Sequence, residues 1–151
     1  MAFALRSRDR RGKVKVTLLT SFLLLSVFAA SAQEQAKPSE RNLAGRGKYI
    51  VEQVALCVEC HTPRDSNGVL LRTEYLKGAP VPVQSPPYPQ MKWALKAPAI
   101  AGLPGYSEQQ GIRLLTEGIT RDGRTPDPPM PRYRLNRSDA QAVVAYLRSL
   151  Q

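Results

Sequence analysis

Apolar residues form one long run near the start of the chain and three spaced patterns further along it. The run, VTLLTSFLLLSVFAA, covers residues 16–30. In the later segments, apolar residues recur every three or four positions, which is typical of helices with one buried face. No segment alternates convincingly between apolar and polar residues as a half-buried strand would. The pattern therefore predicts an all-α fold with three main helices.

The first of these helices is expected to start near Ser39 or Glu40 and to run up to a cysteine-rich motif at residues 57–61. Its apolar side comprises Leu43, Tyr49, Ile50 and Val54. Gly45 and Gly47 lower the helix propensity of this segment, so we expect them to allow the close approach of another helix.

The other two helices have start signals of their own. Ser107 and Gln110 form a capping box, and Gly118 ends the helix that follows. The apolar face of that helix comprises Ile112 and Leu115, and Leu114 flanks it. Ser138 and Gln141 form a second capping box before the last helix. The apolar residues of the last helix are Val143, Val144, Tyr146, Leu147 and Leu150.

The N-terminal pattern is that of an export signal. Six basic residues and one acidic residue precede the apolar run, and the small residues of Ala-Ser-Ala follow it. The run is shorter than the roughly 20 apolar residues of a membrane-spanning helix. We expect residues 1–32 to be a cleaved signal peptide, 33–40 a flexible N-terminus and 41–151 the folded domain. The alternative is an uncleaved membrane anchor.

If residues 1–32 are removed on export, the net charge of the remaining protein falls, and with it the support for nucleic-acid binding. The sequence has 22 basic and 12 acidic residues, a net charge of +10. Residues 1–32 hold six of the basic and one of the acidic residues, which leaves 16 against 11, or +5, on the other 119. No long basic run remains, so nucleic-acid binding is not expected. The signal predicts a periplasmic protein, or a membrane-anchored one that faces the periplasm if the signal is retained.

Both cysteines and the only histidine fall within five positions, CVECH at residues 57–61. A disulfide is one use of such a pair in an oxidising compartment. A redox dithiol is expected near a βαβ unit, and the pattern predicts none. Zinc needs a fourth ligand, and the chain has no further Cys or His. Covalent attachment of haem needs only what the motif provides.

The spacing of the motif suits a haem c. On a helical turn, Cys57 and Cys60 lie on one face, and His61 is four positions from Cys57. The two thiols can form thioethers with the two vinyl groups of one porphyrin, while the imidazole is left pointing at the iron. We expect one covalently attached haem, anchored by Cys57 and Cys60, with His61 as an axial metal ligand.

Met130 is the candidate for the opposite axial position. Its segment, TPDPPMPRYRL, contains four prolines, which exclude a helix and predict a stiff extended loop. A pre-set loop lowers the entropy cost of holding a weak thioether ligand. Met91, beside Trp93, is expected to be hydrophobic filling. The alternatives are an ordinary core role for Met130 and an open sixth position on the iron.

Three segments carry a resemblance to a known family: GRGKYIVEQVALCVECHTPRD, APAIAGLPGYSEQQ and PPMPRYRLNRSDAQAVVAYLRSL. From about Asn42 to Leu150 the chain resembles a class I, monohaem cytochrome c domain. It is similar in particular to the cytochromes that accept electrons from bacterial periplasmic dehydrogenases. The resemblance implies a small all-α cytochrome c fold with the haem ligands named above. It also implies that the Pro98 carbonyl accepts a hydrogen bond from the His61 ring.

The resemblance further implies that the terminal helices cross, with Gly47 against Tyr146 and Tyr49 nearby in the core. The sequence departs from compact members of the family between Thr62 and Lys96. In this stretch, Asn67-Gly68 predicts a turn and a short hairpin, and residues 79–89 contain five prolines. We expect the proline-rich segment to be a semi-rigid loop over the haem edge.

These features predict an electron carrier rather than an enzyme, moving single electrons between a dehydrogenase and a respiratory acceptor. The alternatives are a haem subunit of a larger oxidoreductase and a haem sensor or enzyme with an open sixth site. The last would need a distal acid or base, for which no acidic residue is expected. Five arginines flank Met130: Arg121, Arg124, Arg132, Arg134 and Arg137. They predict docking of an acidic redox partner, unless they are only solvated or pair with haem propionates.

Overall fold

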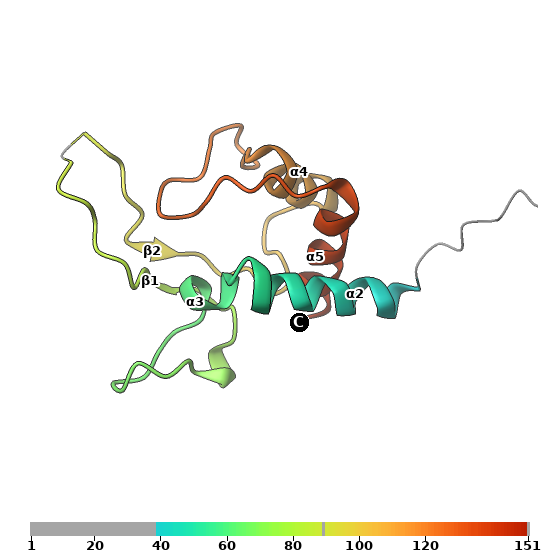
Figure 1. Ribbon diagram of the computed structural model, residues 1–151, viewed down its shortest axis with the longest axis horizontal. Helices are drawn as coiled ribbons and strands as arrows, with labels where there is room; N and C mark the ends of the chain where they lie inside the picture. Colours follow the sequence, from blue (N-terminus) through green and yellow to red (C-terminus); the bar gives the residue numbers. More distant parts are fainter. Residues whose placement is uncertain (1–38, 89, 151) are drawn as a thin grey trace, which may run out of the picture. The chain divides into compact units, whose positions relative to one another are not determined.

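The computed structural model describes residues 39–88 and 90–150 (Figure 1). The expected signal peptide and residues 33–38 lie outside this part of the chain. The described α-helices are α2 (Glu40–Tyr49), α3 (Cys57–His61), α4 (Glu108–Glu117) and α5 (Arg137–Ser149). The strands β1 (Ala79–Pro80) and β2 (Lys96–Ala97) form one small antiparallel ladder. The expected all-α fold is confirmed. In these two ranges, no helix has the length and apolar character needed to cross a membrane.

Helix α2 begins where the sequence predicts and then changes type. Ser39 caps it by accepting a hydrogen bond from the Asn42 amide. After Tyr49 the chain continues as the π-helical stretch η2 (Ile50–Val54), whose i→i+5 hydrogen bonds widen the turn. The wider turn buries Ile50 and Val51, while Tyr49 and Val54 are more than half exposed. The expected placement of these last two on the buried side is therefore wrong.

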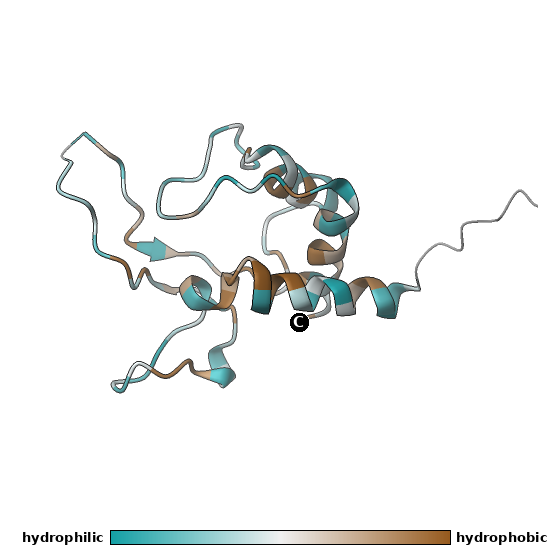
Figure 2. Ribbon diagram, viewed as in Figure 1, coloured by the Kyte–Doolittle hydropathy of each residue, from teal (hydrophilic) through white to brown (hydrophobic). Residues whose placement is uncertain are grey.

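Helices α2 and α5 pack against each other through Gly47. A Cβ on Gly47 would overlap the carbonyl oxygen of Ala142 and lie 2.8 Å from Cβ of Tyr146. The expected contact between Gly47 and Tyr146 is therefore present. Gly45, by contrast, faces open space, so the close approach expected of it is wrong. Figure 2 shows hydrophobic residues on both helices where they cross.

Helix α4 starts as the sequence predicts, whereas α5 has a different cap from the predicted one. Helix α4 has the expected capping box, with both hydrogen bonds between Ser107 and Gln110 formed, and it ends at Gly118 with a φ of 67°. The expected capping box of Ser138 at α5 is wrong. Asn136 is the cap, because its Oδ1 accepts from the Asp139 amide at 2.8 Å, and the Ser138 hydroxyl donates to the same oxygen.

In the long connection between α3 and α4, the chain reverses direction twice. At the first, Asp65 accepts hydrogen bonds from the amides of Asn67 and Val69, and Gly68 has a φ of 80°, so the predicted turn is confirmed. At the second, the β1–β2 ladder and the hydrogen bond from Val81 N to Leu95 O close a loop of residues 81–95. Figure 1 shows this loop extending away from the helices.

Candidate haem-binding site

A cavity of about 830 Å³ lies between α3, the 81–97 loop, α4, the loop that contains Met130, and α5. Its volume is within the range of pockets that hold small molecules and cofactors. Most of its wall is apolar. The apolar side chains that line it include Ile100, Leu103, Leu115, Val143 and Leu147. The cavity thus provides a dry environment for a large flat ligand.

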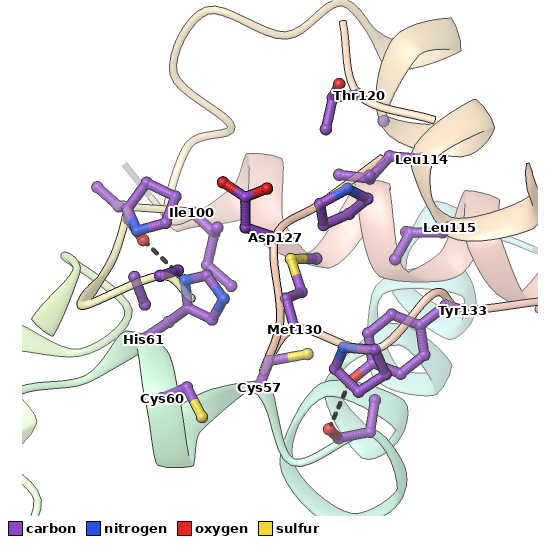
Figure 3. A pocket seen from close by; sticks show the side chains of 18 of the residues that line it. Cys57, Cys60, His61, Ile100, Leu114, Leu115, Thr120, Asp127, Met130 and Tyr133 are labelled. Atoms are coloured by element: carbon purple, nitrogen blue, oxygen red, sulfur yellow. Dashed lines mark hydrogen bonds between the residues drawn. The ribbon is translucent and has the colours of Figure 1, made fainter. Parts of the chain in front are cut away.

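Helix α3 brings both thiols and the imidazole to one wall of the cavity. Leu56, in the left-handed conformation at a φ of 51°, turns the chain sharply into this short helix. Cys57, Cys60 and His61 all line the cavity, and the two cysteines are not joined to each other (Figure 3). The sequence therefore places the three residues of the motif together, as its spacing indicates.

The environment of Cys57 does not suit a redox dithiol. Burial raises the pKa of the Cys57 thiol to about 11, whereas reactive dithiols have a lowered pKa and a stable thiolate. A zinc site is not supported either, because no cluster of three or more Cys, His, Asp or Glu side chains occurs among residues 39–88 and 90–150. Of the uses considered for the motif, thioether formation with haem suits this wall best.

His61 is held in one orientation. Its side chain is buried, and its Nδ1 lies 2.7 Å from the carbonyl oxygen of Pro98. Because a carbonyl oxygen can only accept, Nδ1 carries the proton and Nε2 keeps its lone pair for a metal. Burial also lowers the pKa of His61, which favours the neutral imidazole that can bind iron. The hydrogen bond between the His61 ring and the Pro98 carbonyl, which the family resemblance implies, is therefore present.

Met130 lies across the cavity from His61. Figure 3 shows its sulfur on the side of the cavity opposite the imidazole, with Cys57 and Cys60 along one edge between them. The loop that contains Met130 is not helical, as its prolines predict, although it bends at Pro128 and Pro129 rather than running straight.

Met91 is not part of this site. Its side chain is 45 % exposed, and the residue does not line the cavity. The expectation that Met91 fills the hydrophobic core is therefore wrong. Of the methionines that the structure describes, Met130 alone lines the cavity.

Two hydrogen bonds that the sequence did not predict hold the Met130 loop in place. The Ala94 amide donates to the Pro128 carbonyl at 2.7 Å, which joins this loop to the 81–95 loop. The Tyr133 hydroxyl donates to the Ala55 carbonyl at 2.9 Å, which joins it to the turn before Cys57. Burial raises the pKa of Tyr133 to about 12, so its hydroxyl remains a donor at neutral pH. A lone tyrosine in a proline-rich segment gives no sequence signal for this role.

The residues present fit a covalently bound haem. Two thiols, an imidazole with a free Nε2 and a thioether sulfur surround one apolar cavity of adequate volume. Polar and charged residues occupy part of the rim: Lys96, Thr120, Arg121, Asp122, Arg124, Thr125 and Asp127. Of these, the basic residues Lys96, Arg121 and Arg124 can pair with the charged carboxylates of a haem, while the remaining wall takes its apolar face.

Comparison with known proteins identifies the family. The cytochrome c family profile matches residues 44–151, and the chain belongs to this family. Family membership gives it electron transfer as its general function and haem c as its cofactor. The match also spans the described part of the chain from within α2 to its end, in agreement with the all-α fold.

Two curated relatives are longer than this chain. The chain is 29 % identical over 136 residues to the fructose dehydrogenase cytochrome subunit of Gluconobacter japonicus, covering 83 % of this chain and 27 % of the relative. It is 31 % identical over 108 residues to a diheme cytochrome c-type protein of Cereibacter sphaeroides, covering 68 % and 34 %. The chain thus spans about a third or less of these relatives. The expected similarity to cytochromes that serve dehydrogenases is confirmed.

Proposed function

We propose that this chain carries single electrons on one haem c, attached through Cys57 and Cys60 with His61 and Met130 as axial ligands. We further propose that it does so in the periplasm, between a dehydrogenase and a respiratory acceptor. The observation that supports this most directly is the cavity that has the CVECH wall on one side and the Met130 sulfur on the other.

The residues around the cavity have distinct tasks in this function. When bound, the haem supplies a one-electron couple. Pro98 orients the His61 ring, so that Nε2 is presented to the iron. The thioether of Met130 is a weak ligand for the ferric state and therefore raises the reduction potential. The apolar wall excludes water, which limits reorganisation when the charge on the iron changes.

A sensor or enzyme with an open sixth site is the less favoured alternative. It would require that Met130 is not a ligand and that another group acts as a distal acid or base. No acidic residue was expected in that role, but Asp127 lines the cavity and is the candidate for it (Figure 3). The carrier proposal is supported over this alternative by the Met130 sulfur, which faces the His61 ring from the other side of the cavity.

The surface near Met130 suggests how a redox partner docks. All five arginines between residues 121 and 137 are exposed, and two aspartates in this stretch reduce their charge to +3. Arg124 is paired with Asp122, and the hydrogen bonds from Thr120 and Arg124 lower the pKa of Asp122 to about 2. Arg121 and Arg124 also line the cavity. We propose that an acidic surface of the partner docks here, because opposite charges accelerate weak, transient encounters.

A tightly bound subunit is the second form of this function. It is favoured by the relative that is named as the cytochrome subunit of a dehydrogenase. Its haem chemistry would be the same, and only the affinity for the partner would differ. Sedimentation of the purified chain with and without a candidate dehydrogenase separates the two forms.

The first test is spectroscopic. We expect protein exported to the periplasm to keep its colour after acid–acetone extraction, with one haem per chain by the pyridine haemochrome method. The oxidised spectrum should contain the weak charge-transfer band at the red end that marks methionine–ferric ligation. Haem that is retained without this band and that binds carbon monoxide readily would favour a sensor. A chain without covalent haem would contradict the proposal.

A further inference from the structure

We propose that the segment Tyr75–Gly78 is a positioning element for His61, and that the hydrogen bond from Tyr75 to Glu52 anchors it. This inference rests on the proposed role of His61 as an axial ligand. It adds residues outside the cavity wall to those that control the iron, and neither the CVECH motif nor the proline-rich loop indicates them.

The first contacts join this segment to the backbone that carries His61. The Gly78 amide donates to the His61 carbonyl at 2.8 Å. The Leu76 amide donates to the Thr62 hydroxyl at 3.0 Å. Thr62 and Leu76 are both almost fully buried, so their hydrogen bond cannot be replaced by one to water without opening the core. The segment thus fixes the end of α3 from outside the cavity.

The second contacts join the same segment to the backbone that holds the His61 ring. The Leu76 carbonyl accepts hydrogen bonds from the amides of Ile100 and Ala101, at 2.9 and 3.1 Å. Gly78 has a φ of +90°, and a Cβ there would lie 2.9 Å from the Pro98 carbonyl carbon. The segment therefore contacts both partners of the His61–Pro98 hydrogen bond. A displacement of it must change the geometry of that bond.

The anchor of the segment is a carboxylate in η2. The Tyr75 hydroxyl donates to Oε1 of Glu52 at 2.6 Å, and the Tyr146 hydroxyl donates to the same oxygen at 3.1 Å. Burial and the hydrogen bond to Glu52 raise the pKa of Tyr75, so its hydroxyl is a donor throughout the neutral range. Glu52 thereby connects the 75–78 segment to the crossing of α2 and α5.

The expected consequence is a change in the donor strength of the imidazole. The Nδ1–H···O bond of an iron-bound histidine increases the basicity of its ring and so stabilises the ferric state. If the 75–78 segment loosens, the hydrogen bond to Pro98 weakens, and the reduction potential should rise. The ring proton should also exchange with solvent more rapidly, because local opening becomes easier.

Two tyrosine variants provide the test. Tyr75→Phe and Tyr146→Phe each remove one hydroxyl from Glu52 Oε1 and keep the ring, but only Tyr75 belongs to the segment. In the haem-loaded protein, we would measure the reduction potential and, by NMR, the exchange rates of the His61 Nδ1 proton and the Gly78 amide. For Tyr75→Phe we expect both exchange rates to increase about fivefold and the potential to rise. The Tyr146 hydroxyl also lies 3.3 Å from the Tyr75 hydroxyl, so for Tyr146→Phe we expect changes in the exchange rates and the potential that are clearly smaller than those of Tyr75→Phe.

A second pair tests the other end of the segment. Thr62→Val removes the acceptor of the Leu76 amide, and Thr62→Ser restores it with a smaller side chain. We expect the valine variant to raise the potential and the serine variant to return it to near the parent value. Equal effects of Tyr75→Phe and Tyr146→Phe would overturn the inference. A parent protein without histidine-ligated haem would instead refute the proposed function, so the two failures are distinguishable.

Discussion

The backbone carbonyl of Ala142 occupies the space where a side chain on Gly47 would lie, so α2 and α5 cross in backbone contact. Gly47→Ala should therefore force the helices apart and lower the free energy of unfolding by about 2 kcal/mol. Gly45→Ala is the matched control, because Gly45 faces open space and alanine should stabilise the helix by up to ~1 kcal/mol. Urea unfolding followed by circular dichroism measures both. Equal stabilities of the two variants would show that the crossing tolerates a methyl group.

Met130→Ala should leave the haem attached, because the proposed thioethers to Cys57 and Cys60 do not depend on it. We expect a lower reduction potential and rapid binding of carbon monoxide or cyanide at the vacated position. Met91→Ala serves as the control, since Met91 lies outside the cavity. An unchanged spectrum and potential in Met130→Ala would exclude Met130 as the distal ligand.

Tyr133→Phe should weaken the attachment of the Met130 loop to the turn before Cys57. The lost hydrogen bond leaves the Ala55 carbonyl without this donor, which should lower the free energy of unfolding by about 1 kcal/mol. We also expect faster binding of cyanide, because the loop separates from the iron more often. Tyr88→Phe is the control, as Tyr88 is 63 % exposed. The rate of cyanide binding, measured by stopped flow, would be the same in both variants if Tyr133 had no such role.

The ion pair between Arg46 and Asp139 should make part of the stability depend on acid pH. Its atoms lie 2.9 Å apart, and the hydrogen bond from Arg46 lowers the pKa of Asp139 below its ordinary value. A lowered pKa contributes stability that is complete above the unfolded value of about 3.9 and is lost as the pH falls through the folded value. Arg46→Gln should reduce the pH dependence of the free energy of unfolding below about pH 4, measured by urea unfolding at several pH values. An unchanged pH dependence would show that the ion pair contributes nothing measurable.

The ionic-strength dependence of electron entry tests the arginine surface. If the five arginines attract an acidic donor, raising the salt concentration should slow the bimolecular rate. Arg132→Gln together with Arg134→Gln should reduce both the rate at low salt and its dependence on salt. A rate that does not respond to ionic strength would leave these arginines as solvated surface charge.

The sequence predicted where the helices lie better than it predicted which residues cap them or which of their side chains are buried. The capping box at Ser107 was foreseen because all its partners lie within four residues. At α5 the cap is Asn136, two residues before the expected Ser138, because its oxygen accepts from both the Asp139 amide and the serine hydroxyl. The exposure of Val54 was missed because helical periodicity assumes a uniform turn, and the turn of η2 is wider.

The residues of the site also fall into those that local sequence indicates and those that it does not. Cys57, Cys60 and His61 are brought together by their spacing in one short helix, so the sequence alone indicates them. The Tyr133 hydroxyl and, outside the wall, the Leu76 carbonyl form hydrogen bonds with backbone groups distant in the chain, and such contacts leave no motif. Pro98 was indicated by resemblance rather than by spacing, since 37 residues separate it from His61.

The 81–95 loop is closed at its base by the β1–β2 ladder and the hydrogen bond from Val81 N to Leu95 O, and Trp93 Nε1 donates to the Val83 carbonyl just beyond it. The Ala94 amide joins the loop to Pro128. Beyond Val83, the described residues as far as Trp93 do not line the cavity. In engineering terms, this outer part of the loop is a replaceable segment. A new segment grafted between Val83 and Trp93 should leave the cavity wall unchanged.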